Sequence, residues 1–146
     1  MITVQDAPGQ LEAAVARLNL TTDSLVGEYG YDDDVDFDLR DAIEEQIGTD
    51  LLDENSDDVL DAVVLWWRED DGDLTDALVD AVPSLAESGS IWVLTPKTGR
   101  PGFVEPSDVA EAAQIAGLSP TTSFSGGAEW TFTRLVRPRS ESRNRR

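Results

Sequence analysis

The sequence of 146 residues contains no cysteine and no histidine. Without cysteine the chain has neither disulfides nor thiolate metal sites, which fits a reducing compartment. Without histidine it has no imidazole general base, no Ser-His-Asp triad and none of the nitrogen ligands on which zinc and copper sites depend. These two absences exclude more enzyme classes than any motif in the chain supports.

Long apolar runs are also missing. The N-terminal residues, Met1 to Pro8, have neither the basic start nor the apolar core of a signal peptide. No apolar run approaches the roughly 20 residues that span a bilayer. We therefore expect a soluble, cytoplasmic protein without membrane association. The length, with no internal repeat and no linker, predicts one domain.

Basic residues are scarce and unevenly placed, with 11 Lys and Arg against 30 Asp and Glu and a net charge of -19. From Arg134 onward there are six Arg and one Glu, a sum of +5, so residues 1–133 carry 5 basic and 29 acidic groups, or -24. Such a body repels phosphates, and we expect no direct nucleic-acid binding. We predict a domain at residues 9–137 and a disordered basic tail at 138–146, which folds back loosely on the acidic body.

The chain is organised around a strand, helix and strand between Asp61 and Pro96. Residues 61–67 and 90–95 are short apolar runs, typical of strands buried on both faces. Between them, apolar side chains recur at helical spacing and share one face. They are Leu74, Ala77, Leu78, Ala81, Val82 and Leu85. A right-handed crossover of this kind predicts two adjacent, parallel, central strands.

The remaining elements follow from the same periodicities and from Gly and Pro boundaries. They are helices at 11–18, 38–47 and 105–116, strands at 24–30, 121–125 and 130–136, and a short edge strand at 50–53. The last two strands are joined across Gly126-Gly127, which predicts an antiparallel hairpin. The whole pattern predicts a single-domain, three-layer, Rossmann-like α/β sandwich with a mostly parallel sheet.

Ligands of such sheets bind outside the carboxyl ends of the strands, and three loops are expected to meet there. These loops are residues 31–34, 68–72 and 96–102. Their charged residues are the candidates for binding a ligand or partner: Asp32, Asp33, Asp34, Arg68, Lys97 and Arg100. The basic groups either hold an anionic group of an incoming molecule or neutralise the three aspartates within the chain. We favour the second interpretation.

The acidic loop also suggests a metal site. Asp34, Asp36 and Asp38 alternate, and Glu45 falls where an EF-hand loop places its bidentate ligand. However, Leu39 stands where that loop requires glycine, and the preceding segment is predicted to be a strand. We therefore predict no metal site and expect the acidic residues to cap the following helix, with Gly48 as its C-terminal stop.

No cofactor-binding loop follows the first predicted strand. Residues 27–34 lack the close glycine pair of a Gly-x-Gly-x-x-Gly loop and carry negative charge instead. We predict no cofactor, and in particular no binding of S-adenosylmethionine or a dinucleotide. Trp66, Trp67 and Trp92 are expected to pack in the core rather than to form a stacking platform. For Trp130, a core position and an exposed edge both stay open.

Three stretches resemble a known family. They read Gly27-Glu-Tyr-Gly-Tyr-Asp-Asp-Asp-Val-Asp36, Leu65-Trp-Trp-Arg68 with Asp71-Gly-Asp-Leu74, and Thr95-Pro-Lys-Thr-Gly-Arg100 leading to Val104-Glu-Pro-Ser-Asp108. In these motifs, from about Leu11 to Val136, the chain resembles the bacterial domain-of-unknown-function family three-zero-five-two. It departs at residues 130–134, where Trp-Ser-Gly is usual. The resemblance implies a Rossmann-like domain, similar in element order to the later half of class I methyltransferases, and implies no activity.

For function we expect a non-enzymatic protein-interaction or regulatory module with a protein partner, because imidazole, thiol and cofactor loop are all absent and the surface is charged. Two alternatives stay open. One is a degenerate methyltransferase-like protein or enzyme that binds a small ligand. The other is an acidic DNA mimic or a protein associated with the transcription machinery. Fold analogy alone does not decide among them.

Overall fold

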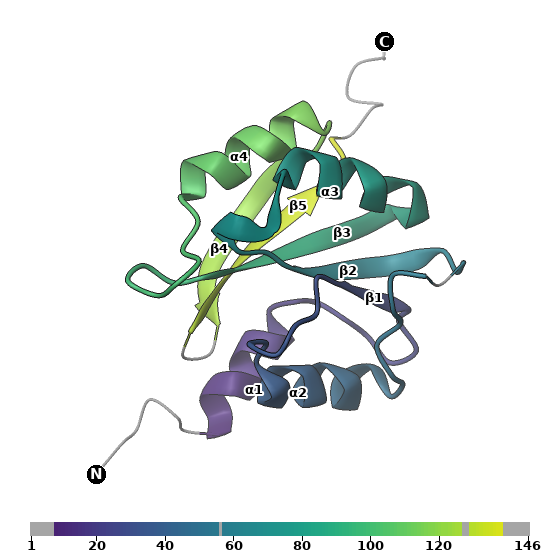
Figure 1. The fold of residues 1–146 in the computed structure, drawn as a ribbon. Helices are drawn as coiled ribbons and strands as arrows, with labels where there is room; N and C mark the ends of the chain where they lie inside the picture. Colours follow the sequence, from purple (N-terminus) through teal and green to yellow (C-terminus); the bar gives the residue numbers. More distant parts are fainter. Residues whose placement is uncertain (1–7, 56, 127–128, 139–146) are drawn as a thin grey trace.

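The computed structural model describes residues 8–55, 57–126 and 129–138, and there it forms one five-stranded sheet with helices on both faces (Figure 1). The strands are β1 (Val26–Tyr29), β2 (Leu60–Trp66), β3 (Leu85–Pro96), β4 (Ser119–Gly126) and β5 (Trp130–Val136). The helices are α1 (Pro8–Ala16), α2 (Phe37–Ile47), α3 (Leu74–Ala81) and α4 (Pro106–Ile115), with short 3-10 helices η2 (Glu69–Asp71) and η3 (Val82–Ser84). Gly127 of the predicted turn and the predicted tail from Arg139 lie outside the described residues.

The sheet has the strand order β1-β2-β3-β5-β4. β1, β2 and β3 are parallel, with Gly27 opposite Val63 and Val63 opposite Ile91. β5 runs antiparallel to both β3 and β4. The prediction of a parallel central pair and an antiparallel final pair is confirmed, and so is the three-layer α/β class.

Each face of the sheet has its own apolar core. Along β2, Val63 and Leu65 point towards α3 and α4, whereas Val64 and Trp66 point towards α1 and α2. Successive side chains of a strand point to opposite faces, so a strand covered on both sides needs an unbroken apolar run. This explains why residues 61–67 show no polar alternation.

The tryptophans lie in these cores. Trp66 and Trp92 are fully buried and Trp67 is nearly so, as expected. Trp130 is also buried, because β4 forms the sheet edge and β5 lies inside it. The ring centroids of Trp130 and Trp66 lie 4.8 Å apart in an edge-to-face arrangement. The open question about Trp130 is thus answered by strand order.

The central helix is shorter than its apolar stripe suggests. α3 ends at Ala81, and Leu85, which the periodicity assigned to the helix, is the first residue of β3 and pairs with Leu60 of β2. Pro83 explains the difference, since it has no N–H to continue the helical ladder, and the chain tightens into η3 instead. β3 therefore starts five residues before the predicted strand at Ser90.

The first strand is short and sits beside a single bridge. The predicted strand at 24–30 is reduced to Val26–Tyr29, and Gly30 leaves it with a φ of 78°. The predicted edge strand at 50–53 is only a parallel bridge between Leu52 and Gly27. The N–H of Glu28 donates to the carbonyl of Leu52 at 2.7 Å. Two backbone hydrogen bonds join Leu52 to β1, and these are too few to make residues 50–53 a strand.

The ends of α2 agree with the local chemistry of its sequence. Asp36 has an extended backbone and accepts a hydrogen bond from the N–H of Leu39, so it is the N-cap. Gly48 has a φ of 79°, and its N–H donates to the carbonyl of Glu44. The acidic loop thus serves in part to begin α2, as expected.

Candidate functional site

The path of the chain across the sheet reverses beside β1. From β1, α2 leads to the bridge at Leu52 on the outer edge of β1, and the chain then returns to β2 on the inner edge. In open α/β sheets, ligands bind outside the carboxyl ends of the strands at such a reversal. Here that position lies after Tyr29 and Trp66. We refer to it as the switch-point crevice.

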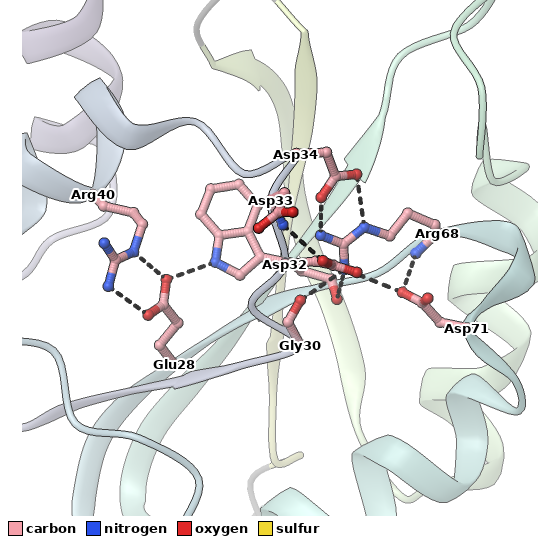
Figure 2. Close-up of polar contacts among 9 residues, drawn as sticks. Glu28, Gly30, Asp32, Asp33, Asp34, Arg40, Arg68 and Asp71 are labelled. Atoms are coloured by element: carbon pink, nitrogen blue, oxygen red, sulfur yellow. Dashed lines mark hydrogen bonds and ion pairs between the residues drawn. The ribbon is translucent and has the colours of Figure 1, made fainter.

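The guanidinium group of Arg68 lies at the switch-point crevice and contacts the loop after β1 (Figure 2). Its Nε donates to Oδ2 of Asp34 at 3.0 Å, and its Nη2 donates to Oδ1 of the same carboxylate. Its Nη1 donates to the carbonyl of Gly30 at 2.7 Å and to Oδ2 of Asp71 at 3.2 Å. The side chain of Arg68 therefore joins the loop after β1 to the end of β2 and to η2.

The backbone closes tightly around this arginine. The backbone N–H of Arg68 donates to Oδ2 of Asp71 at 2.9 Å. The guanidinium of Arg68 lies 5.5 Å from the ring centroid of Trp130. The N–H of Glu69 donates to the carbonyl of Gly102 at 3.0 Å. The three loops predicted to converge at the carboxyl ends of the strands are thus brought together. Arg68 is only 9% exposed.

Only part of the predicted charge pairing is present. Asp34 pairs with Arg68, but Asp32 and Asp33 are exposed and form no ion pair within the described residues. Oδ1 of Asp32 instead accepts the N–H of Asp33 at 2.7 Å, which shapes the turn. The side chains of these two aspartates thus remain on the surface beside the crevice.

The two other basic candidates lie in the loop after β3. Nη1 of Arg100 donates to Oε1 of Glu129 at 2.7 Å, so its partner is this glutamate and not one of the three aspartates. The backbone N–H of Lys97 donates to the carbonyl of Glu129 at 3.0 Å. Arg100 therefore pairs with the hairpin end beside Trp130 and not with the acidic loop after β1.

The ion pair in the crevice shifts the pKa values of both Asp34 and Arg68. The hydrogen bond from Arg68 is the main cause that lowers the pKa of Asp34 below its ordinary value. Burial on its own would lower the pKa of Arg68, but the hydrogen bonds to Asp34 and Asp71 outweigh it and the pKa is raised. Both groups are therefore charged at neutral pH.

Gly30 is fixed against the end of β2. A Cβ at this position would lie 2.2 Å from the carbonyl oxygen of Trp66, which is far inside van der Waals contact. The positive φ of Gly30 also favours glycine. This close approach turns the carbonyl of Gly30 towards Arg68, so the glycine after β1 supports an internal arginine.

A second polar network lies on the α2 side of the same loop (Figure 2). Nε and Nη2 of Arg40 donate to the carboxylate of Glu28 at 2.6 and 2.8 Å, and the indole N–H of Trp66 donates to the same carboxylate at 2.9 Å. The hydrogen bonds with Glu28 raise the pKa of Arg40 above its ordinary value. Glu28 is 8% exposed, so its charge needs these partners.

Sequence reasoning did not identify Glu28, Arg40, Asp71 or Glu129 as partners. One signal was present, because Glu28 stands inside a predicted strand and a buried carboxylate requires a cation. The identity of that cation depends on how α2 is placed over β1. Within the described residues, no group of three or more acidic side chains is arranged to hold a metal ion, and no helix is long and apolar enough to cross a membrane.

Solved structures with a similar fold include SAM-dependent methyltransferases. The pyocyanin biosynthetic protein PhzM superposes with a TM-score of 0.63 at 12% identity, covering 90% of this chain and 56% of PhzM, so the chain spans about half of that protein. A SAM-dependent methyltransferase from Aquifex aeolicus gives 0.59 at 11% identity, covering 90% and 94% of the two chains. A TehB-like SAM-dependent methyltransferase from Corynebacterium glutamicum gives 0.55 at 16% identity, with 87% of each covered. At these identities the likeness establishes the fold.

Relatives in sequence are bacterial and uncharacterised. Proteins of Mycobacterium bovis and Mycobacterium tuberculosis are each 54% identical over 129 residues, covering 88% of this chain and 81% of theirs. Residues 15–139 match the family described as "Protein of unknown function (DUF3052)". This range contains the switch-point crevice and both polar networks. The chain therefore belongs to this bacterial family of unknown function.

Proposed function

We propose that this protein is a non-enzymatic interaction module that recognises another protein, on a methyltransferase-like fold whose ligand position is closed. The observation that carries the proposal is the guanidinium of Arg68 in the switch-point crevice. A ligand at that position would have to separate Arg68 from Asp34, Asp71 and the carbonyl of Gly30. That exchange leaves a nearly buried charge without its partners, which is costly.

Electrostatics add to this argument. S-adenosylmethionine carries a sulfonium cation, and the guanidinium of Arg68 would repel it at short range. The carboxylates that would offset this repulsion, Asp34 and Asp71, already bind Arg68. The chain also has no histidine or cysteine to act as base or nucleophile.

The surface beside the crevice has the composition of a contact site. Tyr31 and Phe37 are about half exposed, and their rings pack edge to face with centroids 6.2 Å apart. The guanidinium carbon of Arg40 lies 4.9 Å from the ring centroid of Tyr31, within cation–π range. Aromatic side chains are enriched in protein interfaces. Asp32 and Asp33 adjoin this pair and favour a partner with basic groups.

Calorimetry tests the closed ligand position. We expect S-adenosylmethionine, S-adenosylhomocysteine and NAD each to bind with a Kd weaker than about 1 mM, whereas a working cofactor site binds in the micromolar range. Micromolar binding of any of them to the wild-type protein would overturn the proposal. It would support the second candidate, a methyltransferase-like ligand-binding protein, which the fold of the solved neighbours favours.

Affinity capture tests the interaction itself. We expect a specific protein to co-purify with the wild-type chain from its native bacterium and to be lost with the Tyr31→Ala/Phe37→Ala double variant. Val59→Ala is the control, because Val59 is also exposed, at 65%, and precedes β2 at the end of that strand opposite the crevice. If the captured protein binds DNA and added DNA releases it, the acidic DNA-mimic alternative is supported instead.

A further inference from the structure

A groove of about 460 Å³ lies on the other side of the sheet, between the N-terminal part of α3 and the length of α4 from Asp108 to Ile115. Its floor is apolar and consists of Trp67, Leu74, Val104 and Ala112, all less than 10% exposed. The indole of Trp67 is the largest apolar group there. The groove is separate from the switch-point crevice, in which Arg68 points towards Asp34.

Four carboxylates surround this floor: Glu69, Asp73, Asp108 and Glu111. All four are exposed, and no Lys or Arg in the described part of the chain forms an ion pair with them. Asp73 caps α3 and Asp108 lies in the first turn of α4, so helix dipoles offset part of their charge. Glu69 and Glu111 have no such local compensation.

Exposed apolar side chains lie beyond the groove on α3 and within its lining on α4. Val79 lies one turn after Thr75 on the same face of α3, and it is 48% exposed. Ile115 lies one turn after Glu111 on α4 and is 66% exposed. A small molecule would fill the groove, in contact with Ile115, and leave Val79 in water. An elongated occupant would cover both side chains.

We infer that this groove binds a basic, amphipathic helical segment of a partner protein. Resting on the interaction function proposed above, the inference adds a second contact surface, on the side of the sheet opposite Tyr31 and Phe37, and states the partner chemistry that it fits. An apolar side chain of the segment packs on Trp67 and Ile115, and flanking Lys or Arg side chains approach Glu69 and Glu111. Helices bind hydrophobic grooves in this manner, with anchors at helical spacing. The acidic rim repels nucleic acid and acidic segments.

The test uses two fluorescein-labelled synthetic helices of about 16 residues, long enough to form a helix in water. Both have Leu at helical spacing, and their remaining positions are Lys and Ala in one and Glu and Ala in the other. Fluorescence anisotropy with the full-length protein at about 0.15 M salt gives the affinities. We expect saturable binding of the Lys peptide, no binding of the Glu peptide, and shifts of the Trp67 indole resonance in NMR spectra.

Two pairs of variants localise the binding. Glu69→Lys/Glu111→Lys is expected to weaken the Lys peptide about tenfold or more, the loss of roughly two partly desolvated charge contacts. Asp41→Lys/Glu45→Lys makes the same charge change on exposed positions of α2 and is expected to leave the affinity within about twofold. Ile115→Ser is expected to weaken binding, whereas Val59→Ser, equally exposed at 65%, is not.

Three outcomes would overturn the inference. One is an equal loss with the α2 variant, which would mean unspecific attraction to an acidic body. The second is an unshifted Trp67 resonance under saturation. The third is at least tenfold tighter binding when Arg143, Arg145 and Arg146 are replaced by Ser in the full chain, since the groove would then belong to the chain's own C-terminal segment. The calorimetry described above is independent of all three, so a failure here leaves the test of the closed crevice intact.

Discussion

The guanidinium of Arg68 binds both carboxylate oxygens of Asp34. These two residues are 34 positions apart, and their contact joins the end of β2 to the loop after β1. Two parallel hydrogen bonds between a planar guanidinium and a carboxylate fix orientation as well as distance. The position outside the carboxyl ends of β1 and β2, where sheets of this class bind ligands, therefore holds an internal ion pair.

The first prediction concerns pH. Asp34 has a pKa below its ordinary value of 3.8, so its ion pair stabilises the fold above that pH, and the contribution is lost as the pH falls through the lowered pKa. Asp34→Asn should lower the free energy of unfolding at neutral pH by only about 1 kcal/mol, because the carboxylate is half exposed. Urea titrations of both proteins from about pH 7 to about pH 3 should show the difference shrinking on acidification. A constant difference would contradict the assignment, and Asp33→Asn is the control.

The second prediction concerns Gly30. Gly30→Ala combines a positive φ with a contact of 2.2 Å to the carbonyl oxygen of Trp66, whereas Gly99→Ala has a φ of 89° at a position with nothing within 4 Å. Gly99→Ala should cost about 1 kcal/mol from the backbone conformation alone. Gly30→Ala should cost at least about 2 kcal/mol more, because the end of β2 has to move. Equal melting temperatures of the two variants would contradict this account of the crevice.

The third prediction concerns the buried carboxylate of Glu28. Glu28→Ala leaves Arg40 and the indole N–H of Trp66 without their acceptor, and it should lower the free energy of unfolding by about 3 kcal/mol. Glu28→Gln retains an acceptor for the indole and should cost less. Glu45→Ala, on the exposed side of α2, should stay within about 0.5 kcal/mol of the wild type. Chemical denaturation measures all three, and a silent Glu28→Ala would mean that the network contributes no stability.

The fourth prediction concerns Arg100. Its ion pair with Glu129 is exposed, so Arg100→Glu should reduce stability by under about 1 kcal/mol. A thermal melt should show a modest decrease in Tm, and capture of the partner should be intact. If the partner is lost while the melting curve is unchanged, Arg100 binds the partner directly and its pairing with Glu129 is secondary.

The difference between the predicted and the observed end of the central helix has a physical cause within the sequence. The apolar stripe from Leu74 to Leu85 continues at helical spacing, but Pro83 interrupts the ladder, and the rest of the stripe is used by η3 and β3. The apolar spacing indicates which side chains face the core. The first residues of a strand that starts on the same face fit that spacing as well as a longer helix would. Pro83 thus already indicates in the sequence where the helix ends.

The sequence by itself determined the parallel pair of β2 and β3, because unbroken apolar runs require burial on both faces. It also determined where α2 begins and ends, since Asp36 and Gly48 act on backbone groups only a few residues away. Only the tertiary structure decided that Arg68 pairs with Asp34 and Asp71, that Arg100 pairs with Glu129, and that Glu28 pairs with Arg40. Each of these contacts depends on side-chain atoms meeting within hydrogen-bond distance, and except for Asp71 their partners come from distant parts of the chain. Opposite charges at many different sequence separations could form ion pairs. The packing of α2 and of the loops on the sheet decides which of them come into contact.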